Sequence, residues 1–231
     1  FILKGDYEFI LLHLAKILRK GKKNFPAGVV SREENKIINR GFAPLIEPLD
    51  LLPYPARNIF PSNDSPAPGI YWDGFCQSYP AIQMHSSRGC PYHCYFCLWN
   101  QVMYRNGEYR TFSPTRVVDE MEEIKRRYRT KEIYFDDDDF TIDRKHVLSI
   151  CSEILQRNLK IKWSCMADAI NLDQELLEKM AQSGCIGIKF GVESASTRIL
   201  SQIGKPVNLK KVQKIARLSA KYRIKSHATF T

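Results

Sequence analysis

The chain has 231 residues, 44% hydrophobic and 26% charged, and this composition is typical of a folded globular domain. No apolar run approaches the roughly 18 residues needed to span a bilayer and no secretory signal is visible, so we expect a cytoplasmic protein without a transmembrane segment. Residues 195–231 carry nine Lys or Arg and no acidic residue, within a net charge of +10, and we interpret them as a solvated basic face, because no nucleic-acid-binding motif accompanies them.

The first predicted element is an amphipathic helix over residues 7–20, with Gly21 as its C-cap. Its expected apolar face consists of Phe9, Leu12, Ala15, Ile17 and Leu18. The chain begins with Phe1 rather than Met and ends inside a predicted strand. We therefore expect a piece of a longer protein, cut at both ends.

A proline-rich segment follows. Residues 44–80 hold eight of the twelve prolines. Such a density forbids long helices and favours extended segments and turns, so we interpret the segment as a connector between two domains. It also contains several aromatic and aliphatic residues, and we expect it to pack on a neighbouring surface.

From residue 81 onwards, strands and helices alternate. The predicted strands are 81–87, 131–135, 161–166, 186–192 and 224–230, and the helices between them are 115–128, 144–156 and two that begin after the N-caps Asp173 and Asn208. This alternation favours a parallel sheet with helices outside it. Right-handed crossovers allow an open doubly wound sheet or a (β/α) barrel, and in both the chemistry gathers at the carboxyl ends of the strands.

Three cysteines, Cys90, Cys94 and Cys97, follow the first of these strands within "GCPYHCYFC". A structural zinc site prefers four ligands, commonly two CxxC pairs, and only one pair is present. A thioredoxin-like CxxC would leave Cys90 unexplained. A 4Fe–4S cluster held by three thiolates would keep one iron open for a substrate. From the residues alone, the cluster and zinc both stay open.

Two further strand ends carry carboxylates. The second strand ends in "FDDDDF", which contains Asp136, Asp137, Asp138 and Asp139, and the fourth ends in "GVES" with Glu193. Four adjacent carboxylates repel one another unless cations or hydrogen-bond donors meet them. Their place after a strand favours ligand binding over a solvated acidic turn.

The segments "SRGCPYHCYFC", "FDDDDFT" and "GCIGIKFGVESAS" together resemble the radical S-adenosylmethionine (radical SAM) superfamily over residues 80–231. The earlier "KGDYEFILLHL" and "PLIEPLDLLPYPARNIFP" look like the end of a cobalamin-binding domain and its connector, as in a subgroup that includes methyltransferases and a cyclase. This resemblance implies an α/β fold: a partial (β/α)6 TIM-like radical SAM barrel (81–231) cut in its fifth strand. It also implies a remnant of a Rossmann-like cobalamin-binding domain (1–45) and a Pro-rich connector (46–80).

The same resemblance implies the chemistry. Cys90, Cys94 and Cys97 would ligate a 4Fe–4S cluster whose open iron is chelated by S-adenosylmethionine (SAM), and one electron would cleave SAM to methionine and a 5′-deoxyadenosyl radical. Cobalamin would be bound through the part of the protein that precedes Phe1, and the full-length protein would carry out cobalamin-dependent methyl transfer or cyclisation. No catalytic residue is identified, and the implied cofactor-binding residues are Phe96, Asp137, Asp138, Ser164, Glu193 and Ser194.

The chain departs from the family pattern after the third strand, where Asp168 stands in place of an expected Arg and Ile170 in place of an expected Asp. Lys189 therefore becomes a candidate for the SAM carboxylate. The implied partners are a small-molecule or lipid-like substrate and a flavodoxin- or ferredoxin-type electron donor, without nucleic acid. Two alternatives remain: an RNA methylthiotransferase, although residues 1–75 lack the extra cysteines typical of that family, and a non-catalytic zinc module.

Overall fold

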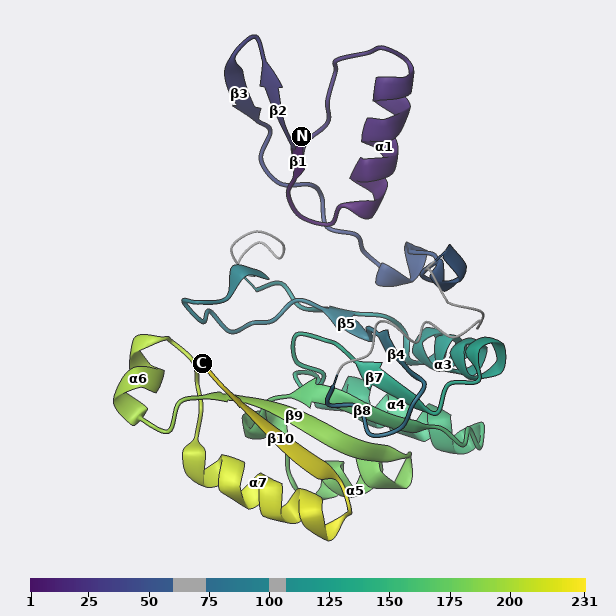
Figure 1. The fold of residues 1–231 in the computed structure, drawn as a ribbon, viewed down its shortest axis with the longest axis vertical. Helices are drawn as coiled ribbons and strands as arrows, with labels where there is room; N and C mark the ends of the chain where they lie inside the picture. The colour runs from purple at the N-terminus through teal and green to yellow at the C-terminus, as the bar shows by residue number, and fades with distance from the viewer. Residues whose placement is uncertain (60–73, 100–106) are drawn as a thin grey trace.

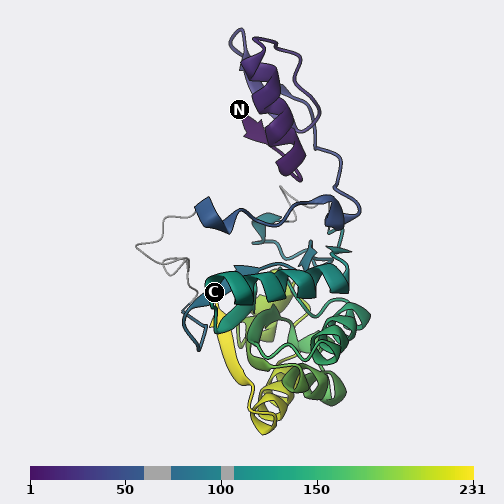
Figure 2. The same cartoon turned by 90° about the vertical axis from the view of Figure 1, so that its right-hand side faces the viewer.

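A small N-terminal unit and a larger α/β core, joined by an extended connector, make up the protein (Figure 1). The computed structural model describes residues 1–59, 74–99 and 107–231. In the side view the N-terminal unit stands clear of the core over most of its length, and the first part of the connector, residues 46–59, runs along the boundary between them (Figure 2).

The N-terminal unit combines one helix with an antiparallel sheet. Strands β1 (Ile2–Leu3), β2 (Val29–Glu33) and β3 (Lys36–Asn39) pair in the order β1-β2-β3, and helix α1 spans Glu8–Arg19. The β2–β3 turn places Glu34 and Asn35 at positive φ (44° and 65°), as a two-residue hairpin turn that follows the strand twist requires. The sequence analysis predicted α1 but none of these short strands.

The predicted apolar face of α1 is wrong except for Ile17. The buried residues are Ile10, Leu14 and Ile17, which pack with Phe25 and Val29, whereas Phe9, Leu12 and Leu18 are exposed. Residues 9–18 are apolar on nearly every side, so periodicity alone allows more than one face. The choice is made by the short strands, which the sequence did not reveal.

The connector packs on the core, as expected for the part of residues 44–80 that the structure describes. It contains two 3-10 turns, Leu49–Leu51 and Arg57–Ile59. Ile46, Leu49 and Leu52 belong to the main hydrophobic core. Arg57 is buried and donates to Glu120 at 2.6 Å, an ion pair that fixes the connector to a core helix. The limits 46–80 for the connector stay a prediction.

The core is a five-stranded parallel sheet in the order β10-β9-β8-β7-β4, which confirms the predicted parallel α/β fold. Its strands are β4 (Ala81–Met84), β7 (Glu132–Phe135), β8 (Lys162–Ala167), β9 (Cys185–Glu193) and β10 (Lys225–Phe230). Its helices are α3 (Pro114–Tyr128), α4 (Arg144–Gln156), α5 (Gln174–Gln182), α6 (Thr197–Gln202) and α7 (Leu209–Lys221). Helices α3, α4, α5 and α7 form one layer, each in contact with the next. The sequence analysis did not predict α6.

Each crossover helix starts where its sequence supplies a cap. The side-chain oxygens of Ser113, Asp143, Asp173 and Asn208 accept backbone N–H groups at the first turns of α3, α4, α5 and α7. These bonds satisfy donors that a helix leaves unpaired at its N-terminus. The caps therefore set where each helix begins after its strand, and so set the length of each loop at the carboxyl edge.

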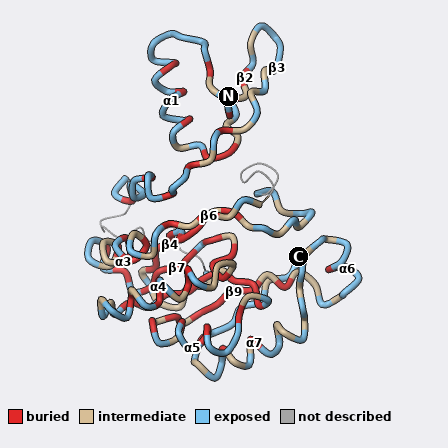
Figure 3. Tube along the Cα trace, turned by 180° about the vertical axis from the view of Figure 1, so that it is seen from behind, coloured by how far each residue is buried: buried red, intermediate tan, exposed pale blue. Residues whose placement is uncertain are grey.

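The two faces of the sheet are buried in different ways. Between sheet and helices, Phe135 stacks on Phe140 and packs edge-to-face on Trp163. Buried residues gather along the strands of the sheet and the helix faces that cover it (Figure 3). On the opposite face, Phe75 packs on Tyr134, and the space over Gly187 is taken up by Phe75 and Gln77. None of the helices in the described ranges is long and apolar enough to cross a membrane.

The turn from α5 into β9 depends on Gly184, which has φ +105° and would place a Cβ 2.4 Å from the Ile161 carbonyl oxygen. We expect Gly184→Ala to lower the free energy of unfolding by about 3 kcal/mol, since left-handed strain and overpacking both oppose it. Urea unfolding followed by circular dichroism measures this. The matched control is Gly204→Ala: φ is +68° but the nearest atom to the added Cβ is 3.4 Å away. It should cost only about 1 kcal/mol, and equal losses would contradict the steric argument.

Candidate functional site

A cavity of about 630 Å³ opens at the carboxyl edge of the parallel sheet, a volume within the range of small-molecule sites. Its walls come from β4, β7, β8 and β9, from the loop that follows β4, and from the N-terminal unit. The polar and cysteine side chains that line it are Tyr7, His85, Arg88, Cys90, Tyr92, Cys94, Cys97, Asp136, Asp137, Asp138, Asp139, Asp168, Glu193 and Lys205. Phe96, Trp99, Met166, Ala167 and Gly191 complete the wall.

The loop that carries the cysteines is closed at its base by a short antiparallel pair, β5 (Ser87–Arg88) with β6 (Arg110–Thr111). Gly89 follows β5 with φ +95°, and an added Cβ would lie 1.8 Å from the Glu108 carbonyl oxygen. Only glycine fits this close approach of the two loop ends. The sequence analysis did not predict β5 or β6, because two-residue strands leave no periodic pattern.

The cysteine loop rests on neighbouring loops of the core. The Tyr95 amide donates to the Ile203 carbonyl oxygen at 2.9 Å, and within the loop itself the Cys97 amide donates to the Cys94 carbonyl oxygen at 3.0 Å. Tyr92 exchanges hydrogen bonds with Asn171 after β8, with the Asn171 amide nitrogen 3.1 Å from the phenol oxygen. These contacts hold the loop over the strand ends.

The three thiols line one cavity, and two of them sit in surroundings that favour the neutral form. Burial, and then the negative charges of Asp139 and Asp138, raise the pKa of Cys90 to about 12. Burial also raises the pKa of Cys94, against the opposing effect of Lys205. Within the described residues, no three or more His, Cys, Asp or Glu side chains lie close enough together to hold a metal ion. Binding of a thiophilic metal would release these protons, as thiolate ligation generally does.

The acidic run after β7 is not a solvated turn. Asp137 is 2% exposed and accepts from the backbone N–H of Ser86 at 3.1 Å and from the hydroxyls of Ser86 and Ser87. Asp138 accepts from the Gly89 amide at 3.2 Å. Both carboxylates thus hold the start of the cysteine loop, so the adjacent negative charges are met by donors from that loop.

Asp139 turns towards the loop after β8. It accepts from the backbone and hydroxyl of Thr141 at 2.8 and 2.7 Å, and from the Asn171 side-chain amide at 3.0 Å. Burial, together with the charge of Asp168, raises the pKa of Asp139 to about 6 despite these donors. Burial also raises the pKa of Asp168 itself.

A cation lies opposite these carboxylates. Lys205 donates to Glu193 at 2.7 Å, and both side chains are nearly buried, 12% and 11% exposed. Glu193 ends β9 with φ +64°, and Gly191 leaves the room that the lysine ammonium occupies, 2.3 Å from where a Cβ would be. Lys205 was not singled out from the sequence, because it lies within the basic stretch interpreted as a solvated face. The flanking Gly204 and Pro206 are the only local signal that it differs from its neighbours.

Most of the predicted site residues come together, and three do not. Cys90, Cys94, Cys97, Phe96, Asp137, Asp138 and Glu193 line the cavity. Ser164 instead lies near the amino end of β8, fully buried, and donates to Glu132 at 2.6 Å. Ser194 accepts from the Ser196 amide and shapes the turn before α6. Lys189, proposed for the SAM carboxylate, lies further back on β9 and does not line the cavity.

Comparison with known proteins gives this site a context. The family model described as the Radical SAM superfamily matches residues 84–231. An uncharacterized methyltransferase of Pyrococcus horikoshii is 31% identical, over 89% of this chain and 43% of its own length. An anaerobic magnesium-protoporphyrin IX monomethyl ester cyclase of Rubrivivax gelatinosus is 25% identical, over 99% of this chain and 40% of its own. The chain thus spans less than half the length of either relative.

A solved structure shares the fold. The radical S-adenosylmethionine methyltransferase TsrM of Kitasatospora setae, solved with cobalamin and a [4Fe-4S] cluster bound, superposes with a TM-score of 0.73 at 18% identity. The superposition covers 98% of this chain and 44% of that one. The N-terminal unit and the core therefore occur together in one known architecture.

Asp139 gives the site a testable pH signature. Its pKa is about 6 in the folded protein against an ordinary value of 3.8, so the folded state binds more protons between these values. The free energy of unfolding should therefore fall as pH rises from about 4 to 6, by about 3 kcal/mol from this group. We expect Asp139→Asn to remove that share in urea unfolding of the metal-free protein. The exposed Glu178→Gln is the control, and an identical wild-type and Asp139→Asn slope would contradict the assignment.

Proposed function

Because the chain belongs to the radical SAM superfamily, we propose that it holds the cluster- and SAM-binding core of an enzyme that cleaves SAM reductively. The observation that supports this most directly is one cavity lined by three loop cysteines, six carboxylates and Lys205. When bound, the reduced 4Fe–4S cluster would supply the electron that splits SAM into methionine and a 5′-deoxyadenosyl radical. The residues of this chain would bind, orient and shield the reactants.

The charges of the cavity suit the ligand. SAM carries an ammonium, a sulfonium and a carboxylate, and the cavity offers a carboxylate run beside one buried lysine. Asp137 and Asp138 line the cavity beside the cysteine loop, and we assign them to the SAM amino group. Lys205 would take the SAM carboxylate, the role first given to Lys189, and Glu193 would be released to the amino group or the ribose. Phe96 would lie near the adenine.

The donor set fits the cluster. Three thiols on one short loop provide soft ligands for a 4Fe–4S cluster, and the count leaves one iron for SAM. The raised pKa values of Cys90 and Cys94 keep both thiols neutral in the metal-free protein, so cluster binding would release their protons. We therefore assign Cys90, Cys94 and Cys97 as the cluster ligands.

The reaction that follows radical formation is proposed from relatives. Methyltransferases and a cyclase are among the proteins most similar to this chain, and the fold matches that of a cobalamin-containing methyltransferase. We propose cobalamin-dependent methyl transfer or cyclisation in the full-length protein, on a small-molecule or lipid-like substrate. A flavodoxin- or ferredoxin-type protein would deliver the electron.

Iron binding tests the cluster assignment. After anaerobic reconstitution we expect about four irons per chain, and loss of most of this iron in Cys94→Ala with an unchanged circular dichroism spectrum, since the cysteine loop lies outside the core. Cys151→Ala is the control, because Cys151 is a buried core residue on α4. One zinc and no iron in the wild-type protein would contradict the proposed function.

SAM binding tests the lysine. In the reconstituted protein, Lys205→Met should weaken SAM binding about 10- to 100-fold, the effect of losing one charge-assisted hydrogen bond. Equilibrium dialysis with radiolabelled SAM measures the change. The exposed Lys210→Met is the control, and Lys189→Met separates the two candidates. If Lys189→Met weakened binding and Lys205→Met did not, the carboxylate assignment would have to return to Lys189.

A further inference from the structure

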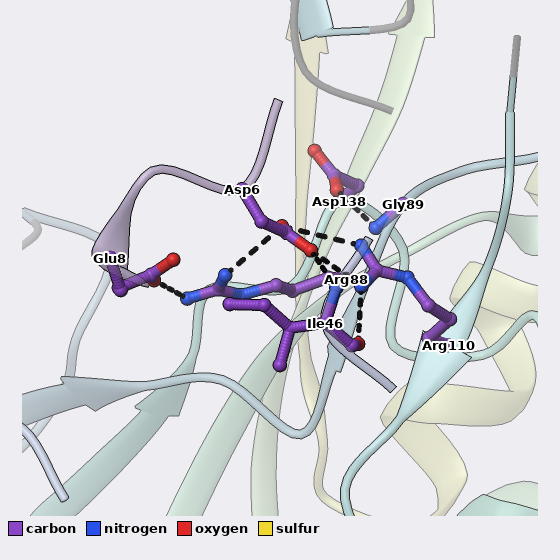
Figure 4. A network of polar contacts seen from close by, with 7 residues as sticks. All are labelled: Asp6, Glu8, Ile46, Arg88, Gly89, Arg110 and Asp138. Carbon is purple, nitrogen blue, oxygen red and sulfur yellow. Dashed lines mark hydrogen bonds and ion pairs between the residues drawn. The ribbon is translucent and has the colours of Figure 1, made fainter. Parts of the chain in front are cut away.

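A cluster of four charged side chains joins the N-terminal unit to the cysteine loop (Figure 4). Asp6 lies between β1 and α1, and its carboxylate, which is fully buried, accepts from Arg110 at 2.6 Å and from Arg88 at 3.2 Å. Glu8 accepts from the other terminal nitrogen of Arg88. Arg88 in β5 pairs with Arg110 in β6 at the base of the loop. Two acidic residues of one unit therefore meet two arginines of the other.

The cluster also includes backbone groups. The Asp6 carboxylate accepts from the Ile46 amide at 2.8 Å, and Arg110 donates to the Ile46 carbonyl oxygen at 2.7 Å. The arginines hold the pKa of Asp6 below its usual range against the effect of burial. The Asp6 carboxylate, which belongs to the N-terminal unit, thus binds both the connector and the base of the cysteine loop.

Stability alone explains this cluster poorly. Taking charges out of water costs several kcal/mol per ion, so a buried ion pair commonly adds little net stability. Two atoms of the cluster, Glu8 Oε2 and Arg110 Nε, are buried without a hydrogen-bond partner among the residues described, which adds to that cost. In some proteins, buried charged or polar groups instead specify a single geometry, and we infer the same benefit for this cluster.

The charged cluster is connected to the cavity in two ways. Arg88 is two residues from Cys90, and the intervening Gly89 is bonded to Asp138. Tyr7, between Asp6 and Glu8, lines the cavity itself. The residues that neutralise the arginines therefore also hold a cavity wall supplied by the N-terminal unit.

We propose that Asp6 is a positioning residue of the active site: it fixes the cysteine loop through Arg88 and Arg110 and holds Tyr7 in the cavity wall. The N-terminal unit thereby completes the site in which the cysteines lie. The proposal deepens the proposed function and rests on it only for the identity of the cavity's occupant.

The test compares Asp6→Asn with Glu33→Gln. Asp6→Asn removes the central charge with little change of shape. Glu33 also pairs with an arginine, Arg40 at 2.6 Å, but inside the N-terminal unit. The first readout is amide hydrogen exchange in the metal-free protein. We expect residues 86–92 to exchange at least about tenfold faster in Asp6→Asn, the effect of one lost charge-assisted hydrogen bond, with residues 162–167 of β8 unchanged.

The second readout is the electron paramagnetic resonance spectrum of the reduced, iron-loaded protein. In Asp6→Asn we expect undiminished iron content but a weaker change of the spectrum on adding SAM; Glu33→Gln should match the wild type in both readouts. Unchanged exchange at residues 86–92, or exchange that rises equally in β8, would overturn the proposal. A wild-type protein that binds no iron would instead refute the proposed function, and the exchange result would still decide the role of Asp6.

Discussion

Parallel pairing of β4, β7, β8 and β9 is the constraint on which the rest of the protein depends. Each right-handed crossover returns the chain to the same edge, so loops distant in sequence end beside one another. The cysteines after β4, the carboxylates after β7, Asp168 after β8 and the Glu193–Lys205 pair after β9 share a cavity for this reason. The register of the parallel strands sets the spacing of the strand ends from which these groups extend.

The acidic run shows how one local conflict is resolved by distributing its charges. Asp137 and Asp138 face donors of the cysteine loop, whereas Asp139 faces donors after β8. The run therefore ties β7 both to the cysteine loop and to the loop after β8. Burial and the charge of Asp168 leave Asp139 with a raised pKa. A ligand that brings positive charge into the cavity would lower that pKa.

Long periodic elements and metal-type motifs could be predicted from the sequence, and features that depend on distant packing could not. The core strands, four of the five core helices and the caps Asp173 and Asn208 follow from local pattern. The structure confirms them, except that the first predicted strand, 81–87, ends at Met84. The buried face of α1 could not be predicted, since it is chosen by strands of two to five residues. In the sequence, Lys205 is one of nine basic residues between residues 195 and 231, and only the fold places it beside Glu193. Ser164 shows the reverse. Its strand was predicted correctly, but Ser164 lies near the amino end of that strand and does not line the cavity.

The connector residues Ile46, Leu49 and Leu52 have a consequence for how such proteins can diversify. They are part of the same hydrophobic core as the sheet and helices, although they precede the matched family region, which begins at residue 84. Recombination at that point would remove Ile46, Leu49 and Leu52 together with the N-terminal unit and would expose core surface. Exchange of N-terminal units between relatives is therefore expected to succeed only when the connector stays with the α/β core. The unit that is inherited as a whole is then longer than the region that the family model matches.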